Sequence, residues 1–164
     1  MKDNLVADKS FDFAVRIVNL HKYLIANGVD YSLAKQLLRC GTSIGANVSE
    51  AVKAQSTADF YTKLTIALKE ANETQYWLKL MFATEYLTEQ QYSSIKKDID
   101  EIIAILVAIT KTTKEKLKIN KIGMWLNLKI RLCFYSFRIS NFEFRIYIPC
   151  NFIYHRTLSL KLHH

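Results

Sequence analysis

Apolar positions recur at helical spacing along most of the first 117 residues. In the most regular stretch, apolar or small residues step by alternating four and three positions, at 60, 64, 67, 71, 74, 78 and 81. This spacing places the side chains on one side of an α-helix. The pattern predicts a helix over about residues 57–86 that buries one face in a bundle.

Three further segments carry the same kind of pattern. A helix over about residues 10–27 would bury Phe13, Ile17, Leu20 and Leu24, and Gly28 is placed to end it. A helix over about 32–54 has Leu33, Leu37, Ile44, Val48 and Ala51 on or near one face. A fourth, over about 89–116, repeats apolar residues at Tyr92, Ile95, Ile99, Ile102, Leu106 and Ile109, the spacing of left-handed bundle packing.

Local signals mark helix starts and one close contact. Ser56 with Asp59, and Thr88 with Gln91, have the spacing of capping boxes. Gly41 and Gly45 each cost about 1 kcal/mol inside a helix relative to Ala, which favours a close approach by a neighbouring helix as the reason for them. Short connections between four helices predict an all-α, up-down-up-down antiparallel four-helix bundle over residues 1–117.

Residues 118–164 differ from this pattern and are predicted to be a non-bundle tail that is disordered or weakly β. The segment is basic and rich in aromatic residues, and residues 142–148 alternate as a strand does. An accessory hairpin or a strand exchanged between subunits is one interpretation. The others are a disordered extension, or translation past the natural end of the domain.

Charge restricts the kinds of partner that the bundle can bind. The formal net charge is +8, but residues 1–117 are almost neutral, with 15 Lys or Arg against 14 Asp or Glu. A near-neutral bundle attracts phosphates only through a local patch. The candidate nucleic-acid-binding residues are Lys9, Arg16, Lys22, Lys35, Arg39, Lys53 and Lys63. In a single chain such residues are usually a solvated face, whereas in a ring of subunits they would form a continuous positive surface.

The sequence gives no pattern typical of catalysis or metal binding. There is no Glu-x-x-His pair, and His21 is the only histidine before residue 155. The three cysteines form no C-x-x-C pair, so we expect Cys40 to be a core residue in a reducing cytoplasm. We therefore expect no catalytic residues, metal, cofactor or small-molecule substrate. The N-terminus lacks a signal-peptide pattern, and no apolar run is long enough for a membrane helix. We therefore expect a cytoplasmic protein.

Polar residues are also aligned along two of the predicted helices. One set shares a face of the second helix, and the other clusters on the third: Arg39, Ser43, Asn47 and Glu50, then Glu70, Glu73, Thr74 and Trp77. An ion pair between Arg39 and Glu70 or Glu73 is sterically reasonable. These residues either fix the register of the helices or belong to a subunit interface or nucleic-acid groove.

Together the two sets resemble a known family. Arg39, Ser43, Ile44, Asn47 and Glu50, followed by Ser56-x-x-Asp59-Phe60 and by Glu70, Glu73, Thr74, Trp77 and Leu78, are similar to the four-helix-bundle family of 23S rRNA intervening-sequence proteins. That family includes the accessory variability protein of diversity-generating retroelements. The resemblance covers about residues 10–115. Gly commonly follows the Glu of the Asn-x-x-Glu element in the family, whereas Ala51 does here.

The resemblance implies a homopentamer that associates with RNA and with a reverse transcriptase. The expected function is therefore that of a non-enzymatic, oligomeric accessory that binds RNA or ribonucleoprotein. The alternative is a structural protein–protein interaction scaffold with no nucleic-acid role. Fold alone does not choose between them.

Overall fold

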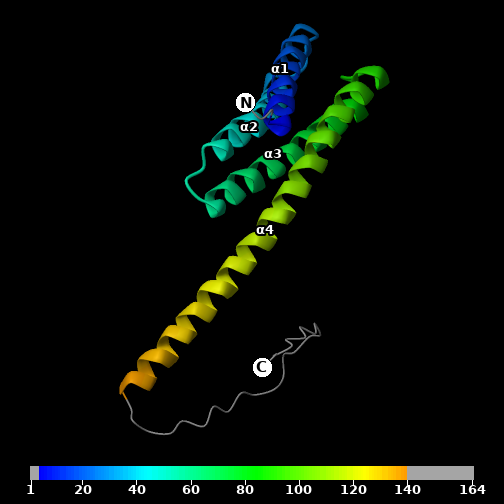
Figure 1. Cartoon of the computed structure of the whole chain (residues 1–164). Helices are drawn as coiled ribbons and strands as arrows, with labels where there is room; N and C mark the ends of the chain where they lie inside the picture. The colour runs from blue at the N-terminus through cyan, green and yellow to red at the C-terminus, as the bar shows by residue number, and fades with distance from the viewer. Residues whose placement is uncertain (1–3, 140–164) are drawn as a thin grey trace, which may run out of the picture. The chain divides into compact units, whose positions relative to one another are not determined.

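The computed structural model describes the backbone of residues 4–139 and the side chains of residues 4–130. The described residues form four helices, labelled in Figure 1: α1 Leu5–Ala26, α2 Tyr31–Val52, α3 Thr57–Ala83 and α4 Glu89–Ile139. The chain divides into two compact units after Met124. The first contains α1, α2, α3 and the part of α4 up to that residue.

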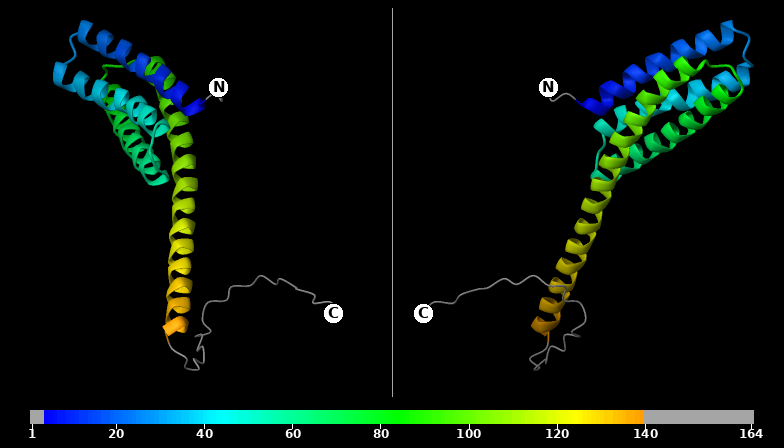
Figure 2. Two further views of the ribbon diagram at one scale, coloured as in Figure 1. Left: turned by 60° about the vertical axis from the view of Figure 1, so that its left-hand side comes forward. Right: turned by 90° about the vertical axis from the view of Figure 1, so that its right-hand side faces the viewer.

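Each helix of the first unit contacts two neighbours. Arg39 on α2 pairs with Glu73 on α3. Gln75 on α3 donates to Asp100 on α4 at 2.6 Å. The first and last helices close the arrangement through Lys9, whose Nζ lies 2.9 Å from a carboxylate oxygen of Glu101. With the short connections between them, the helices form an antiparallel up-down-up-down bundle, visible in both views of Figure 2.

The predicted apolar faces make the core. On α3, positions 64, 67, 71, 74, 78 and 81 are buried, and on α4 the same holds for Ile95, Ile99, Ile102 and Leu106. Phe60, Tyr92 and Ile109, at the ends of these two patterns, are partly buried against the core. The spacing of four and three therefore identified the buried side of both helices.

The two glycines of α2 lie where α1 comes closest. A Cβ on Gly41 would lie 2.8 Å from two side-chain carbons of Ile17. A Cβ on Gly45 would lie 3.2 Å from the carbonyl oxygen of Ser10. An added methyl group would clash at Gly41 and be tightly packed at Gly45, as the predicted close approach implied.

Helix starts follow the capping signals. The Ser56 hydroxyl accepts from the backbone N–H of Asp59 at 3.1 Å. Thr88 and Gln91 exchange both bonds of a capping box, at 2.9 and 3.3 Å. Gly28 follows the end of α1 with φ of 78°, a conformation that glycine adopts without strain.

Three predicted boundaries were wrong. Helix α1 begins at Leu5, five residues before the predicted start, because Val6 and Ser10 extend its buried face by another turn and a half. Helix α3 ends at Ala83, before the predicted Tyr86, where the chain turns through Glu85 at φ of 63°.

The third error concerns α4, which continues to Ile139 where a tail was predicted from residue 118. No proline lies between residues 116 and 139 and the one glycine, Gly123, has nothing within 4 Å of an added Cβ, so nothing in the sequence stops the helix. Residues 118–130 are all exposed, consistent with a segment outside the core. The strand-like residues 142–148 lie outside the described residues.

Candidate functional site

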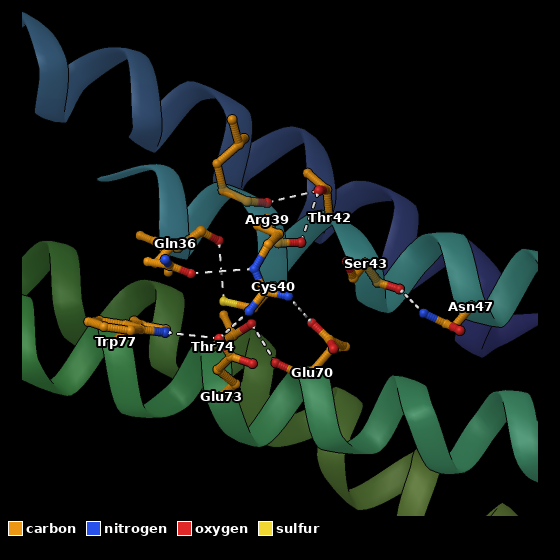
Figure 3. A network of polar contacts seen from close by, with 12 residues as sticks. Gln36, Arg39, Cys40, Thr42, Ser43, Asn47, Glu70, Glu73, Thr74 and Trp77 are labelled. Carbon is orange, nitrogen blue, oxygen red and sulfur yellow. Dashed lines mark hydrogen bonds and ion pairs between the residues drawn. The ribbon is translucent and has the colours of Figure 1, made fainter. Parts of the chain in front are cut away.

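Arg39 stands at the centre of a polar cluster where α2 meets α3 (Figure 3). Its Nη2 lies 2.5 Å from Oε1 of Glu73, and its Nη1 lies 3.6 Å from Oε2 of Glu70. The Trp77 indole N–H donates to the same Glu73 oxygen at 3.2 Å. The expected ion pair across the helix interface is therefore present, and we call Arg39, Glu70, Glu73 and Trp77 the polar cluster.

The polar cluster has a buried side. Thr74 is fully buried, and its hydroxyl donates to the carbonyl of Glu70 at 2.7 Å. The Cys40 thiol is also fully buried, and this burial raises its pKa above the ordinary value. Hydrogen bonding to Glu73 raises the pKa of the Arg39 guanidinium, which stays charged. A protonated thiol beside a closed ion pair is a packing arrangement and offers no nucleophile.

The rest of the predicted polar face does not join this cluster. Asn47 donates its amide to the carbonyl of Ser43 at 2.8 Å, a bond within α2 itself. Glu50 pairs instead with Lys63 on α3. The polar face of α2 thus consists of separate pairs, each linked either to its own helix or to α3.

Four of the seven candidate nucleic-acid-binding residues are in ion pairs. Lys63 pairs with Glu50, Arg39 with the polar cluster, and Lys9 with Glu101. Arg16 pairs with Asp98 and also donates to the Ser94 hydroxyl at 3.0 Å. Because each of these cations already faces a carboxylate, its field toward a phosphate is reduced.

The other three candidates, Lys22, Lys35 and Lys53, are exposed and form no ion pair among the described residues. Lys35 lies 5.7 Å from the centroid of the Tyr31 ring. Tyr31 is 60% exposed and meets the ring of His21 edge-on, with centroids 6.4 Å apart. We call His21, Lys22, Tyr31 and Lys35, at the end of α1 and the start of α2, the basic aromatic surface.

Among the described residues, no group of three or more His, Cys, Asp or Glu side chains could hold a metal ion. The helices of residues 4–139 include none that is both long and apolar enough to cross a bilayer.

The model of the 23S rRNA-intervening sequence protein family matches residues 2–108 of this chain. The chain belongs to that family. The matched residues include α1, α2, α3 and α4 as far as residue 108. They also include the polar cluster and the basic aromatic surface.

One solved structure similar to this chain is that of a protein with unknown function from the S23 ribosomal protein family of Bacteroides thetaiotaomicron. The two are 58% identical, with a TM-score of 0.64. The match covers 65% of this chain and 98% of the relative. No curated protein matches the chain.

The sequence analysis did not identify Tyr31 as a member of the basic aromatic surface. Tyr31 precedes the first buried residue of α2, so the periodic pattern of that helix does not include it. Its position next to the N-cap Asp30, followed four residues later by a lysine, was the available signal. An aromatic residue and a cation at i and i+4 share one side of a helix.

Proposed function

We propose that this protein is a non-catalytic, oligomeric accessory that binds RNA or a ribonucleoprotein through its basic aromatic surface. The observation that carries the proposal is the pairing of Lys35 with the exposed ring of Tyr31. Single-stranded RNA is bound by proteins that stack its bases on aromatic rings and place cations near its phosphates.

The distribution of ion pairs favours these two lysines over four of the other candidate residues. Lys22 and Lys35 have no carboxylate partner among residues 4–130, whereas Lys9, Arg16, Arg39 and Lys63 do. In an oligomer the surface is repeated once for each subunit, so a bundle of small net charge gains many phosphate contacts. We propose a homopentamer by family resemblance, with a reverse transcriptase as a protein partner.

Fluorescence anisotropy with a labelled RNA hairpin that has a single-stranded loop tests the proposal. Tyr31→Ala should lower affinity by about 5- to 150-fold, the equivalent of a stacking energy of about 1–3 kcal/mol. Tyr31→Phe keeps the ring and should bind as the unmodified protein does. Equal affinity in all three proteins would contradict RNA binding at this surface.

A charge-reversal pair tests the lysines separately. Lys22→Glu with Lys35→Glu should weaken binding and flatten its dependence on salt, by about 0.7–0.9 in the log–log slope per lysine. Lys69→Glu with Lys79→Glu changes the net charge equally at exposed positions on α3 and serves as the control. If the two double variants weaken RNA binding equally, the change in affinity comes from net charge and not from contacts at the basic aromatic surface. If the unmodified protein does not bind the hairpin, the scaffold function replaces this one.

A further inference from the structure

The side of α4 that packs in the bundle becomes polar where the core ends. The four-three spacing of its buried residues continues to Thr113, which is 7% exposed. The next positions at this spacing are polar or have no side chain: Lys116, Asn120, Gly123 and Asn127. They lie beyond residues 2–108, which the family model matches. Residues 116–139, which we call the α4 extension, therefore lengthen the helix without lengthening the bundle core.

Large apolar side chains lie on another side of the α4 extension. Positions 119, 122, 126 and 130 are Ile, Ile, Leu and Ile, and steps of three and four place them on one face of the helix. These four side chains are between 48% and 68% exposed. Trp125 is 57% exposed. An apolar face of this size, uncovered among the described residues, is typical of a binding surface.

The charged residues of the α4 extension all have one sign. The segment contains no Asp or Glu, and its cations are Lys116, Lys118, Lys121, Lys129, Arg131 and Arg138. Lys118, Trp125 and Lys129 are adjacent to the apolar face, and the Lys129 Nζ lies 4.0 Å from the centroid of the Trp125 ring. The charge of the segment therefore favours an anionic occupant.

The apolar face and the cations together restrict that occupant. A second copy of the extension would bring cations against cations, with no carboxylate to meet them. An RNA would neutralise the lysines but leave the isoleucine and leucine side chains in water. An anionic lipid surface matches both features, because its acyl chains cover the apolar face and its headgroups attract the lysines. Tryptophan is also enriched at the boundary between these two layers.

We infer that the α4 extension binds along the surface of a membrane that contains anionic lipids. The helix lies in the plane of the interface, with positions 119, 122, 126 and 130 toward the acyl chains. Lys118 and Lys129, beside this face, reach the phosphates of the headgroups with their long side chains. The extension shares no residue with the basic aromatic surface, so the inference is independent of the proposed RNA function.

Sedimentation of the full-length protein with lipid vesicles tests the inference. The protein should bind vesicles of equal parts phosphatidylcholine and phosphatidylglycerol, and bind phosphatidylcholine vesicles much more weakly. Tryptophan emission should shift to shorter wavelength with the anionic vesicles, and Trp125→Phe should remove this shift, because Trp77 lies in the polar cluster. Equal binding to both kinds of vesicle, or binding to neither, overturns the inference.

A triple substitution tests the lysines. In a chain with Lys118→Gln, Lys121→Gln and Lys129→Gln, affinity for the anionic vesicles should fall about fivefold for each lysine lost. The control carries Lys69→Gln, Lys79→Gln and Lys97→Gln, which change the net charge equally at exposed positions on α3 and α4. The same loss in both triple variants overturns the site.

A double substitution tests the apolar face. Ile122→Ser with Leu126→Ser should weaken vesicle binding without changing helicity by circular dichroism, because both side chains are outside the core. Phe11→Ser with Val52→Ser removes exposed apolar side chains from α1 and α2 and serves as the control, which should bind normally. Unchanged vesicle binding in the Ile122/Leu126 variant overturns the inference.

Two further measurements separate the lipid from the other occupants. Anisotropy with the RNA hairpin should give equal affinities for the unmodified protein and the Lys118/Lys121/Lys129 variant. A variant that loses RNA affinity but keeps vesicle binding would assign these lysines to RNA. Light scattering should give the Ile122/Leu126 variant the same mass as the unmodified protein. A smaller mass with unchanged vesicle binding would assign the apolar face to a second copy.

Discussion

Arg39 on α2 and Glu73 on α3 lie 34 positions apart in the sequence, and their side chains meet at 2.5 Å. The same Glu73 oxygen accepts from Trp77, so one carboxylate joins a cation and an indole. The guanidinium is about half exposed, and water and ions therefore screen the pair. We therefore expect the pair to specify how α2 and α3 align more than it stabilises the bundle.

A double-mutant cycle measures that coupling. Arg39→Gln and Glu73→Gln should each lower the urea midpoint. The double variant should lose less stability than the sum of the two single losses, because either single substitution already breaks the ion pair. The coupling should shrink in 1 M NaCl, since the Debye length falls to about 3 Å. Additive losses at low salt would contradict an energetic link between the two residues.

Gly41 should not tolerate even one added methyl group. Gly41→Ala would place a Cβ 2.8 Å from carbons of Ile17, which is β-branched and has little freedom to move away. We expect the free energy of unfolding to fall by about 1–3 kcal/mol, as in other overpacked cores. Urea unfolding followed by circular dichroism measures the loss.

Gly123→Ala provides the control for Gly41. Nothing lies within 4 Å of a Cβ added there, and the residue is in a helix. The substitution should raise helical content, because Ala is favoured over Gly by about 1 kcal/mol in a helix. A loss of stability in both variants would indicate that the contact with Ile17 is not the cause.

The start of α3 depends on the hydroxyl of Ser56. Ser56→Ala leaves the backbone N–H of Asp59 without its acceptor, and we expect a loss of about 1 kcal/mol. Ser93→Ala is a suitable control, because Ser93 is exposed within α4 and its hydroxyl makes no hydrogen bond among the described residues. A similar loss in both variants would contradict a capping role.

Burial of Cys40 makes stability depend on pH in alkaline solution. Burial raises the pKa of this thiol above its ordinary value of 9.0. Above pH 9 the unfolded chain has released the proton while the folded chain still holds it, so the unfolded state is favoured as the pH rises. The stability that the buried, protonated thiol contributes is complete below pH 9 and is lost as the pH rises above that value.

Urea unfolding at pH 7, 8, 9 and 10 checks this dependence in a chain with Cys133→Ser and Cys150→Ser. Cys40→Ala in the same background should remove the part of the slope that comes from the thiol. In that background Cys40 should react with a thiol reagent only as fast as the protein unfolds. Rapid reaction of the folded protein would contradict the burial.

The segment of α4 after the bundle should be dispensable for folding. Residues 118–130 are exposed throughout, and Ile119, Met124 and Leu128 are each more than 55% exposed. A chain that ends at residue 117 should unfold at the same urea midpoint and resist aggregation better, because it lacks this apolar surface. A lower midpoint would place part of the domain beyond residue 117.

The sequence was sufficient to predict the side of each helix that faces the core. Periodic spacing reports which residues share a face, so Leu64, Leu78, Ile99 and Leu106 were placed correctly. Capping residues act within one turn, which is why the starts at Ser56 and Thr88 were also predicted. Helix ends were predicted poorly, because α4 has no stop signal before Ile139.

Long-range pairing could not be predicted in the same way. Arg16 meets Asp98, which lies 82 positions away, and no local pattern indicates which carboxylate a long side chain reaches. Four basic residues assigned to nucleic-acid binding therefore turned out to lie in ion pairs. The basic aromatic surface also depends on the edge-on contact between His21 on α1 and Tyr31 on α2, which is a tertiary feature.

Closure of the bundle by its first and last helices also has a consequence for synthesis. Lys9 and Arg16 find their partners Glu101 and Asp98 only after about 100 residues have been translated. Until then, the side of α1 that packs on α4 has no cover, and a nascent chain exposes apolar surface. Substitutions that slow the docking of α4 should therefore lower the yield of protein in cells before they change the stability of the finished molecule.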